Sequence, residues 1–159
     1  MNINLTALSG KRFLLAHSGG LDSSVLANLL LEASVNFSVA HCNFQLRGSE
    51  SDDDSFFVEK WCKEHNIPFF LNIFSTKTYM EFNKKSTQLA ARELRYKWFD
   101  CLLGTYNFEA LITAHHLNDQ IETFLINTTR GTGISGLLGI QENNKLYRPL
   151  LQESKNSLV

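Results

Sequence analysis

The sequence predicts an α/β fold, with a doubly wound, mainly parallel sheet and helices on both faces. Short apolar runs of strand type recur along the chain, and segments with the 3.6-residue periodicity of amphipathic helices separate them. The first apolar run ends in a glycine turn that leads directly into such a helical segment. Regular alternation of strands and helices implies right-handed crossovers, and therefore strands that run parallel.

The apolar runs define the expected strands. RFLLA at residues 12–16 is a short continuous apolar run, as expected for a strand that is buried on both faces. A strand of this kind is followed by the next helix in a β-α-β unit. The expected strands are Arg12–Ala16, Phe37–His41, Phe69–Ile73 and Ala110–Ala114.

The helical segments fill the intervals between and after these strands. The first begins at Ser23, where apolar residues from Val25 to Ala33 recur on one helix face. The other expected helices are Asp53–His65, Thr87–Leu103 and Asn118–Asn127. Open parallel sheets bind ligands beyond the carboxyl ends of their strands, so candidate site residues are sought just after residues 16, 41, 73 and 114.

Length and composition exclude several classes of protein. The chain has 159 residues, so we expect residues 1–159 to form a single domain. Fifteen basic and sixteen acidic side chains give a net charge of −1, so any site for a polyanion must be local. No run approaches the roughly 20 apolar residues of a membrane helix. The N-terminal segment lacks the order of a secretory signal, so we expect a cytoplasmic protein with no membrane partner.

The three cysteines give no sign of a metal site or a disulfide framework. They are odd in number, widely spaced and form no C-x-x-C pair. We interpret Cys42, Cys62 and Cys101 as buried, reduced thiols, which is the common environment of free cysteine.

The turn at residues 18–23 has the residue types of a phosphate-binding loop. Gly19 and Gly20 allow close approach of the backbone, and the next helix presents unpaired N–H groups and the positive end of its dipole. Ser18 and Ser23 add hydroxyl donors. Asp22 would repel a phosphate unless a divalent cation lay between them, so it is a candidate Mg²⁺ ligand. Alternatively, Asp22 only favours the helix dipole, by ~0.3–1 kcal/mol.

A second polar segment follows the last expected strand. His115 or His116 could donate to a phosphate, and Asp119 and Glu122 share a helix face where they could hold an ammonium group or a cation. Asp-x-x-Glu is also a capping box, worth ~1 kcal/mol to a helix, and the residues alone favour that interpretation.

The segment 77–97 carries a local excess of basic residues. Arg92 and Arg95 are three apart on the long expected helix and could share one exposed face. From the residues alone, a solvated helix face is the ordinary explanation of such a charge run.

The string SGGLDS at residues 18–23 resembles the PP-loop of ATP pyrophosphatases, which split ATP into AMP and pyrophosphate while they activate a substrate oxygen as an adenylate. Further blocks occur in the order seen in the tRNA(Ile)-lysidine synthetase family, at residues 40–54, 88–99, 113–125, 130–140 and 148–151. The resemblance implies a Rossmann-like ligase that uses ATP and Mg²⁺. Its expected reaction joins free L-lysine to C2 of the wobble cytidine of tRNA(Ile) with a CAU anticodon, through an adenylated cytidine, with release of AMP and pyrophosphate.

The resemblance also implies roles for individual residues. Asp22, Arg95 and Asp119 are the expected catalytic residues: Asp22 holds Mg²⁺, Arg95 contacts the ATP phosphates or the anticodon loop, and Asp119 binds the substrate lysine together with Glu122. The expected ATP-binding residues are Ser18, Gly19, Gly20, Leu21, Asp22, Ser23 and His115.

Two positions depart from the pattern of the family. Asn118 stands where the family usually has an aspartate, and Phe44 stands where it often has a histidine. Arg47 is expected near the nucleotide by the same resemblance, and the glycine-rich stretch 131–139 is expected to be a loop near the site.

Two other functions stay open. One is a PP-loop tRNA thiolase, which would normally use reactive or cluster-binding cysteines. The other is a nucleotide-binding module that is inactive in isolation, because the family continues beyond the RPLL block into domains that bind tRNA. We expect this chain to be the catalytic domain without those C-terminal domains, and a homodimer is compatible with the resemblance.

Overall fold

The computed structural model describes residues 5, 8–115 and 146–150, and within them it contains a five-stranded parallel sheet. The strand order is β3-β2-β1-β4-β5. The central strand β1 (Arg12–Ala16) pairs with β2 (Asn36–Asn43) on one side and β4 (Ala110–Thr113) on the other. The outer strands are β3 (Phe69–Ile73) and β5 (Leu146–Tyr147), and both pairings are parallel.

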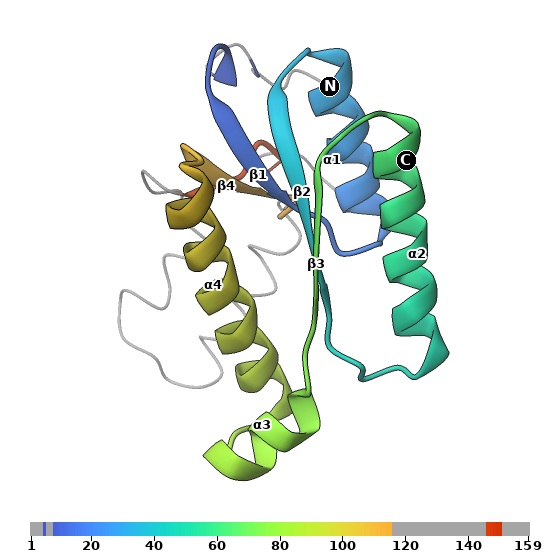
Figure 1. Cartoon of the computed structure of the whole chain (residues 1–159), viewed down its shortest axis with the longest axis vertical. Coiled ribbons are helices and arrows are strands. Elements are labelled where there is room, and N and C mark those ends of the chain that lie inside the picture. Colours follow the sequence, from blue (N-terminus) through green and yellow to red (C-terminus); the bar gives the residue numbers. More distant parts are fainter. Residues whose placement is uncertain (1–4, 6–7, 116–145, 151–159) are drawn as a thin grey trace.

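Helices pack on both faces of this sheet, which confirms the doubly wound fold. Helices α1 (Leu21–Glu32) and α2 (Ser49–Glu64) lie on one face, and α4 (Thr87–Tyr106) lies on the other (Figure 1). The alternation of side chains along β1 explains both layers. Phe13 and Leu15 belong to the core cluster with α1 and α2, whereas Leu14 belongs to the cluster with α4.

Several element boundaries differ from the sequence prediction. Helix α1 begins at Leu21 rather than Ser23, because the Gly20 carbonyl already accepts the Ser24 N–H at 3.1 Å. The hydroxyls of Ser23 and Ser24 bond to the same oxygen. Helix α2 begins at Ser49 rather than Asp53. Its first turn is acidic, which suits a helix N-terminus but carries no apolar periodicity to reveal it. Strand β2 continues to Asn43, β4 stops at Thr113, and α4 continues to Tyr106.

Two elements were not predicted at all. The short helix α3 (Thr76–Asn83) precedes α4, and a polar cluster ties the two together: Tyr79 Oη and Lys85 Nζ both donate to the carboxylate of Glu93, at 2.9 and 2.5 Å. Lys85 belongs to the basic segment 77–97, but Glu93 pairs with its charge. Strand β5 is too short for a pattern. The predicted helix Asn118–Asn127 lies outside the described residues.

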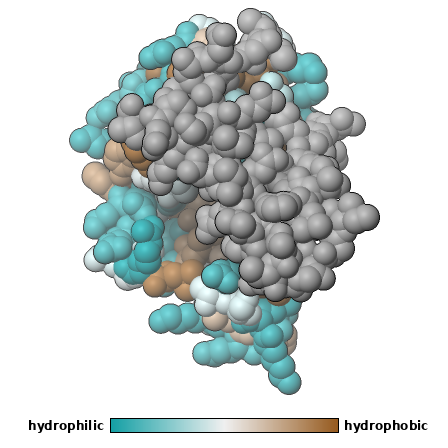
Figure 2. All heavy atoms as spheres, turned by 180° about the vertical axis from the view of Figure 1, so that it is seen from behind, coloured by the Kyte–Doolittle hydropathy of each residue, from teal (hydrophilic) through white to brown (hydrophobic). Residues whose placement is uncertain are grey.

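The surface of the described part carries only scattered large apolar side chains. Phe56 of α2 and Phe82 of α3 are exposed by 68% and 88%. The rear view shows the described atoms as mainly hydrophilic, with small hydrophobic areas between them (Figure 2). No helix among the described residues is long and apolar enough to cross a membrane.

The strand order fixes where a ligand can bind. From β1 the chain moves outward through β2 to β3 and then returns to β4 on the other side of β1. The direction of winding therefore reverses between β1 and β4, and a crevice opens beyond their carboxyl ends. This brings the turn that follows residue 16 close to residues 113–115.

Candidate functional site

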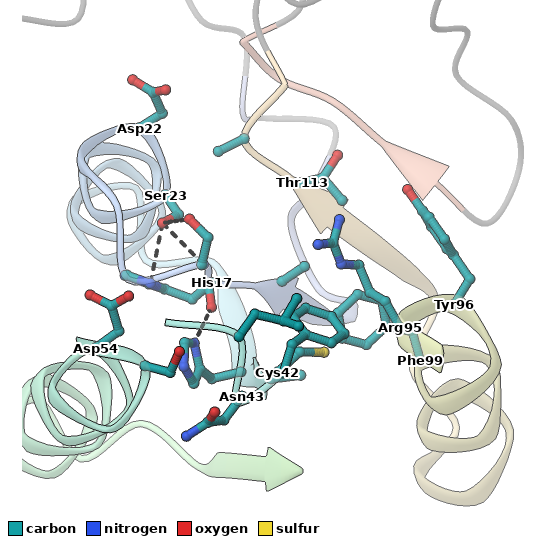
Figure 3. Close-up of a pocket in the computed structure, with 18 of the residues that line it drawn as sticks. His17, Asp22, Ser23, Cys42, Asn43, Asp54, Arg95, Tyr96, Phe99 and Thr113 are labelled. Carbon is teal, nitrogen blue, oxygen red and sulfur yellow. Dashed lines mark hydrogen bonds between the residues drawn. The ribbon is translucent and has the colours of Figure 1, made fainter. Parts of the chain in front are cut away.

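A pocket of about 510 Å³ lies at this reversal point (Figure 3). The turn after β1, the end of β2, the start of α2, one side of α4 and the end of β4 all contribute to its walls. Of the residues expected from the sequence, the pocket walls include Ser18, Asp22, Ser23, Arg47, Arg95 and His115.

The remaining sequence candidates lie elsewhere. Gly19 and Gly20 belong to the turn but are not among the residues of the pocket wall. Leu21 is also outside the pocket wall and is 55% exposed. Arg92 is exposed on α4, with its guanidinium 5.4 Å from the ring centre of Tyr96, and it is not part of the pocket wall. His116, Asn118, Asp119, Glu122 and the glycine-rich stretch lie outside the described residues.

The turn at residues 18–23 is held in shape by its own polar groups. The Ser18 N–H donates to Ser23 Oγ at 3.2 Å, and the Gly20 N–H donates to Ser18 Oγ at 3.2 Å. Ser23 Oγ in turn donates to the Gly20 carbonyl at 3.0 Å. These bonds fold the turn over the N-terminus of α1, where unpaired N–H groups and the helix dipole favour an anion.

Gly19 is required by both the backbone and the packing of this turn. Its φ is +87°, a left-handed conformation that favours glycine. A Cβ atom at this position would lie 2.9 Å from the Cβ of Asp54, which belongs to the first turns of α2. The carboxyl group of Asp54 therefore lies directly against the turn at residues 18–23, a contact that the sequence did not reveal.

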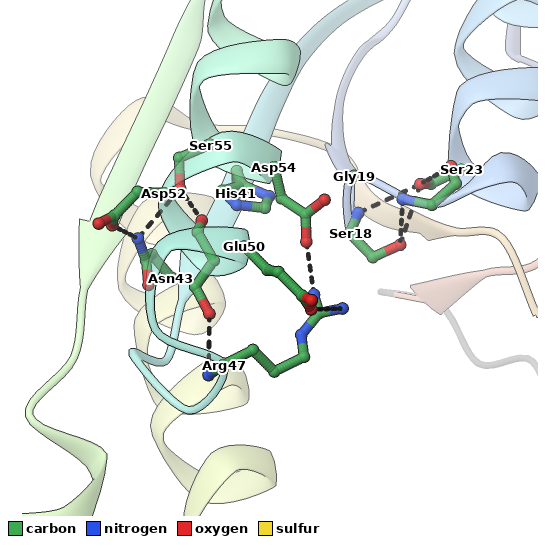
Figure 4. Close-up of polar contacts among 12 residues, drawn as sticks. Ser18, Gly19, Ser23, His41, Asn43, Arg47, Glu50, Asp52, Asp54 and Ser55 are labelled. Atoms are coloured by element: carbon green, nitrogen blue, oxygen red, sulfur yellow. Dashed lines mark hydrogen bonds and ion pairs between the residues drawn. The ribbon is translucent and has the colours of Figure 1, made fainter.

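His17 is the residue of the turn that sequence reasoning missed. It is 3% exposed, and its Nδ1 accepts the Gly19 N–H at 3.1 Å (Figure 4 shows the adjoining contacts). Burial, assisted by neighbouring His41, lowers the pKa of His17 from 6.5 to about 4. The ring is therefore neutral at pH 7, with Nδ1 free to accept and the proton on Nε2.

His41 supports His17 from the neighbouring strand. It is 2% exposed, and its Nδ1 donates to the His17 carbonyl at 2.7 Å. Burial also lowers the pKa of His41, against the opposing effects of that bond and of Asp54. The sequence offers one signal for His17, namely a histidine directly after a buried strand. The parallel pairing of Ala16 with Ala40 places His41 beside His17.

We expect acid to destabilise the fold through His17. The unfolded chain binds a proton at this residue below pH 6.5, whereas the folded chain does not until about pH 4. The free energy of unfolding should therefore fall by about 3 kcal/mol between these pH values on account of this group. The variant His17→Asn keeps an acceptor near Nδ1 but does not titrate, so its stability should depend less steeply on pH.

Urea denaturation at several pH values measures this slope. His65→Asn, at an exposed histidine of the chain, is the matched control and should follow the parent protein. Parallel pH profiles for the parent and His17→Asn would contradict the expectation.

Arg95 supplies positive charge on the opposite wall of the pocket. Its side chain projects from α4 into the pocket (Figure 3), and its guanidinium carbon lies 5.3 Å from the ring centre of Phe44. Burial raises the pKa of the Cys42 thiol to about 12, and the positive charge of Arg95 opposes that rise. The guanidinium therefore acts inside the pocket, not on an exposed helix face as the charge run alone would favour.

Arg47 is at the same pocket but is already engaged. It forms an ion pair with Asp54 and a longer one with Glu50, at 3.9 Å (Figure 4). Its N–H donates to Ser51 Oγ at 3.3 Å. Buried Asn43 fastens the start of α2 to β2 by donating to Asp52 Oδ1 at 2.8 Å. These contacts fix the first turns of α2 beside the turn at residues 18–23.

His115 completes the wall at the end of β4. Thr113 Oγ1 lies 2.8 Å from His115 Nδ1, and Arg148 Nε donates to the same nitrogen at 3.4 Å. Arg148 is 7% exposed and directly follows β5, so the short unpredicted strand places a buried arginine beside His115.

The cysteines are only partly as expected. Cys62 is buried and Cys42 is half-buried, but Cys101 is exposed, so its interpretation as a buried thiol was wrong. It lies on the outward side of α4, whereas Ala90, Phe99 and Leu102 are the buried residues of that helix.

Comparison with known proteins places this geometry in a family. Residues 2–159 match the PP-loop domain family. A tRNA(Ile)-lysidine synthase of Bacteroides thetaiotaomicron is 40% identical over 153 residues, which are 96% of this chain and 36% of that protein. One from Porphyromonas gingivalis is 43% identical over 147 residues, 91% of this chain and 32% of that protein. The chain thus spans about a third of the length of these curated relatives.

Solved structures agree on the fold. The U34-tRNA thiolase NcsA from Methanococcus maripaludis superposes with a TM-score of 0.79 at 19% identity, over 98% of this chain and 58% of that chain. An NMN synthetase from Francisella tularensis gives a TM-score of 0.66 at 16% identity, over 96% of this chain and 60% of that chain. With the match over residues 2–159 and a glycine turn built into a pocket at the sheet's reversal point, this chain belongs to the PP-loop domain family.

Proposed function

We propose that this chain is the ATP-binding catalytic domain of an enzyme that ligates free L-lysine to the wobble cytidine of tRNA(Ile). The observation that carries the proposal is that one pocket joins the PP-loop, at residues 18–23, with the guanidinium of Arg95. The relatives named tRNA(Ile)-lysidine synthase, at 40% and 43% identity over almost all of this chain, support the choice of reaction.

The PP-loop is suited to bind the triphosphate of ATP. The N-terminus of α1 supplies backbone N–H donors, and Ser18 and Ser23 supply hydroxyls beside them. Negative charge grows on the leaving pyrophosphate as the bond to the α-phosphate breaks. Fixed donors and the positive charge of Arg95 stabilise that charge in the transition state.

The residues at this end of the pocket fit a Mg²⁺ ion. Asp22, in the first turn of α1, places a carboxylate in the pocket wall. Asp54 of α2 also lines the pocket, but its carboxylate pairs with Arg47. Mg²⁺ usually takes one or two protein carboxylates and fills its other positions with water and substrate phosphates. When bound, the ion would neutralise phosphate charge, and Asp22 is the residue that we assign to hold it.

The proposed reaction has two steps. The cytidine O2 attacks the α-phosphorus of ATP, and pyrophosphate leaves. The ε-amine of lysine then attacks C2, the C2–O bond breaks, and AMP leaves with that oxygen. We assign Asp119 and Glu122, which lie outside the described residues, to hold the lysine, and ATP, lysine and tRNA would meet in the cytoplasm.

The cysteines give the thiolase alternative little support. Burial raises the pKa of both the Cys42 and the Cys62 thiol to about 12, which keeps them protonated and poorly nucleophilic at neutral pH. The likeness to a solved thiolase, at 19% identity, extends to the fold alone.

Calorimetric titration tests the proposal in stages. A non-hydrolysable ATP analogue should bind this chain more tightly with Mg²⁺ than without it, and absence of nucleotide binding would overturn the proposal. Titration with tRNA(Ile) then shows whether this chain alone also holds the RNA. In the enzyme that contains the domain, AMP release should require both lysine and tRNA(Ile), and AMP release without lysine would favour another reaction of this fold.

A further inference from the structure

The guanidinium of Arg95 stands at the end of a row of aromatic rings. Its carbon lies 5.3 Å from the ring centre of Phe44. Phe44 stacks on Phe74, with 5.4 Å between ring centres and 15° between ring planes, and Phe74 meets Trp98 edge to face at 6.1 Å and 81°. We call Phe44, Phe74 and Trp98 the aromatic column.

The aromatic column connects three separate parts of the fold. Phe44 directly follows β2, and Phe74 directly follows β3. The Phe74 N–H donates to the Asn43 carbonyl at 2.8 Å, which fixes the two residues after the strands side by side. Trp98 is on α4, one turn beyond Arg95, so the column returns to the helix that carries the arginine. The face of Phe44 is therefore fixed relative to α4.

Arg95 differs in its contacts from Arg47, the other arginine of the pocket wall. Arg47 forms ion pairs with Asp54 and Glu50. None of the ion pairs among the described residues includes Arg95. Its guanidinium instead lies over the face of the Phe44 ring. A ring attracts the cation without supplying a carboxylate, so it holds the guanidinium while its N–H donors stay available to an anion.

We propose that Phe44 is a positioning residue, whose ring, supported by Phe74 and Trp98, holds the guanidinium of Arg95 for a phosphate group in the pocket. The identity of that ligand rests on the proposed function, whereas the position of Arg95 in the free protein does not.

The first test measures the position of Arg95 without any ligand. Protons above an aromatic ring are shifted upfield, so ¹⁵N–¹H spectra should show upfield side-chain N–H signals for Arg95, assigned with Arg95→Lys. Phe44→Tyr should keep the shift, and Phe44→Leu and Phe44→Met, which retain apolar volume, should abolish it. Unchanged Arg95 signals in both non-aromatic variants would overturn the inference. Thermal unfolding of each variant shows whether the fold is kept.

The second test measures the consequence for binding, with pyrophosphate and a non-hydrolysable ATP analogue as probes in calorimetry. Loss of one cation–π contact should weaken binding about fivefold in Phe44→Leu, with recovery in Phe44→Tyr. In an Arg95→Ala background, Phe44→Leu should have no further effect, because the ring acts only through the arginine. Equal weakening in both backgrounds would show a general structural role and overturn the inference.

A control variant and the parent protein separate the possible failures. Phe82→Leu changes a phenylalanine that is 88% exposed on α3 and should leave both measurements unchanged. If the parent binds neither probe, the proposed function fails, and the spectra of the free protein still decide whether Phe44 positions Arg95.

Discussion

Replacing Gly19 by alanine is expected to weaken binding of a non-hydrolysable ATP analogue by at least about tenfold. A left-handed φ at a non-glycine residue costs of order 1–3 kcal/mol, and each 1.4 kcal/mol is a factor of ten in affinity. Gly19 has a φ of +87°, and the new Cβ would also lie 2.9 Å from the Cβ of Asp54. The turn must either shift away from α2 or change its backbone conformation, and both changes move the N–H donors proposed to bind the phosphates.

Two further variants separate the two causes and supply a control. In an Asp54→Gly background, which lacks the steric clash but keeps the backbone strain, Gly19→Ala should weaken binding less than it does in the parent protein. Gly104→Ala, within α4, meets no atom within 4 Å and should leave nucleotide binding unchanged while stabilising the helix by about 1 kcal/mol. Parent-like affinity in Gly19→Ala would show that the turn does not bind the phosphates in this conformation.

The fold was predictable because its signals are local. RFLLA is apolar enough to be a strand buried on both faces, and the structure buries Phe13, Leu14 and Leu15 almost completely. The strand order was not predictable in the same way, because pairing depends on contacts between distant segments. β5 shows this limit: Leu146 and Tyr147 are a strand only because they pair with Leu111 and Ile112.

Site residues that lie within one sequence motif could be predicted, whereas site residues that come together only in the folded chain were missed. Ser18, Asp22 and Ser23 lie within one short motif and do line the pocket. His41 and Asp54 come from β2 and α2, and they reach the turn only because β2 pairs with β1 and α2 packs beside it. No spacing in the sequence relates either residue to the glycine turn.

The structure shows where the positive charges of the chain lie relative to the pocket. The net charge of −1 predicted no general affinity for a polyanion. Arg95 projects into the pocket from α4, and buried Arg148 donates to His115 in the pocket wall after β4. These two arginines lie in or beside the pocket proposed to bind phosphate, whereas Lys85 pairs with Glu93 outside the pocket wall.

The variant Asp22→Asn should distinguish the two interpretations of this carboxylate. If Asp22 holds Mg²⁺, the neutral amide should abolish the gain in ATP-analogue affinity that Mg²⁺ provides. In the enzyme that contains this domain, we then expect lysine-dependent AMP release with tRNA(Ile) to fall by about a hundredfold or more, because the phosphate charge is no longer compensated.

If Asp22 serves only the helix dipole, the same variant should lose about 0.3–1 kcal/mol of stability and keep its Mg²⁺-dependent binding. Calorimetry with and without Mg²⁺, combined with urea denaturation, therefore gives opposite patterns for the two roles. Asp100→Asn, at an exposed aspartate of α4, is the matched control and should change neither quantity. Undiminished AMP release by Asp22→Asn would remove this residue from the reaction, because a carboxylate that compensates phosphate charge cannot be replaced by an amide without loss.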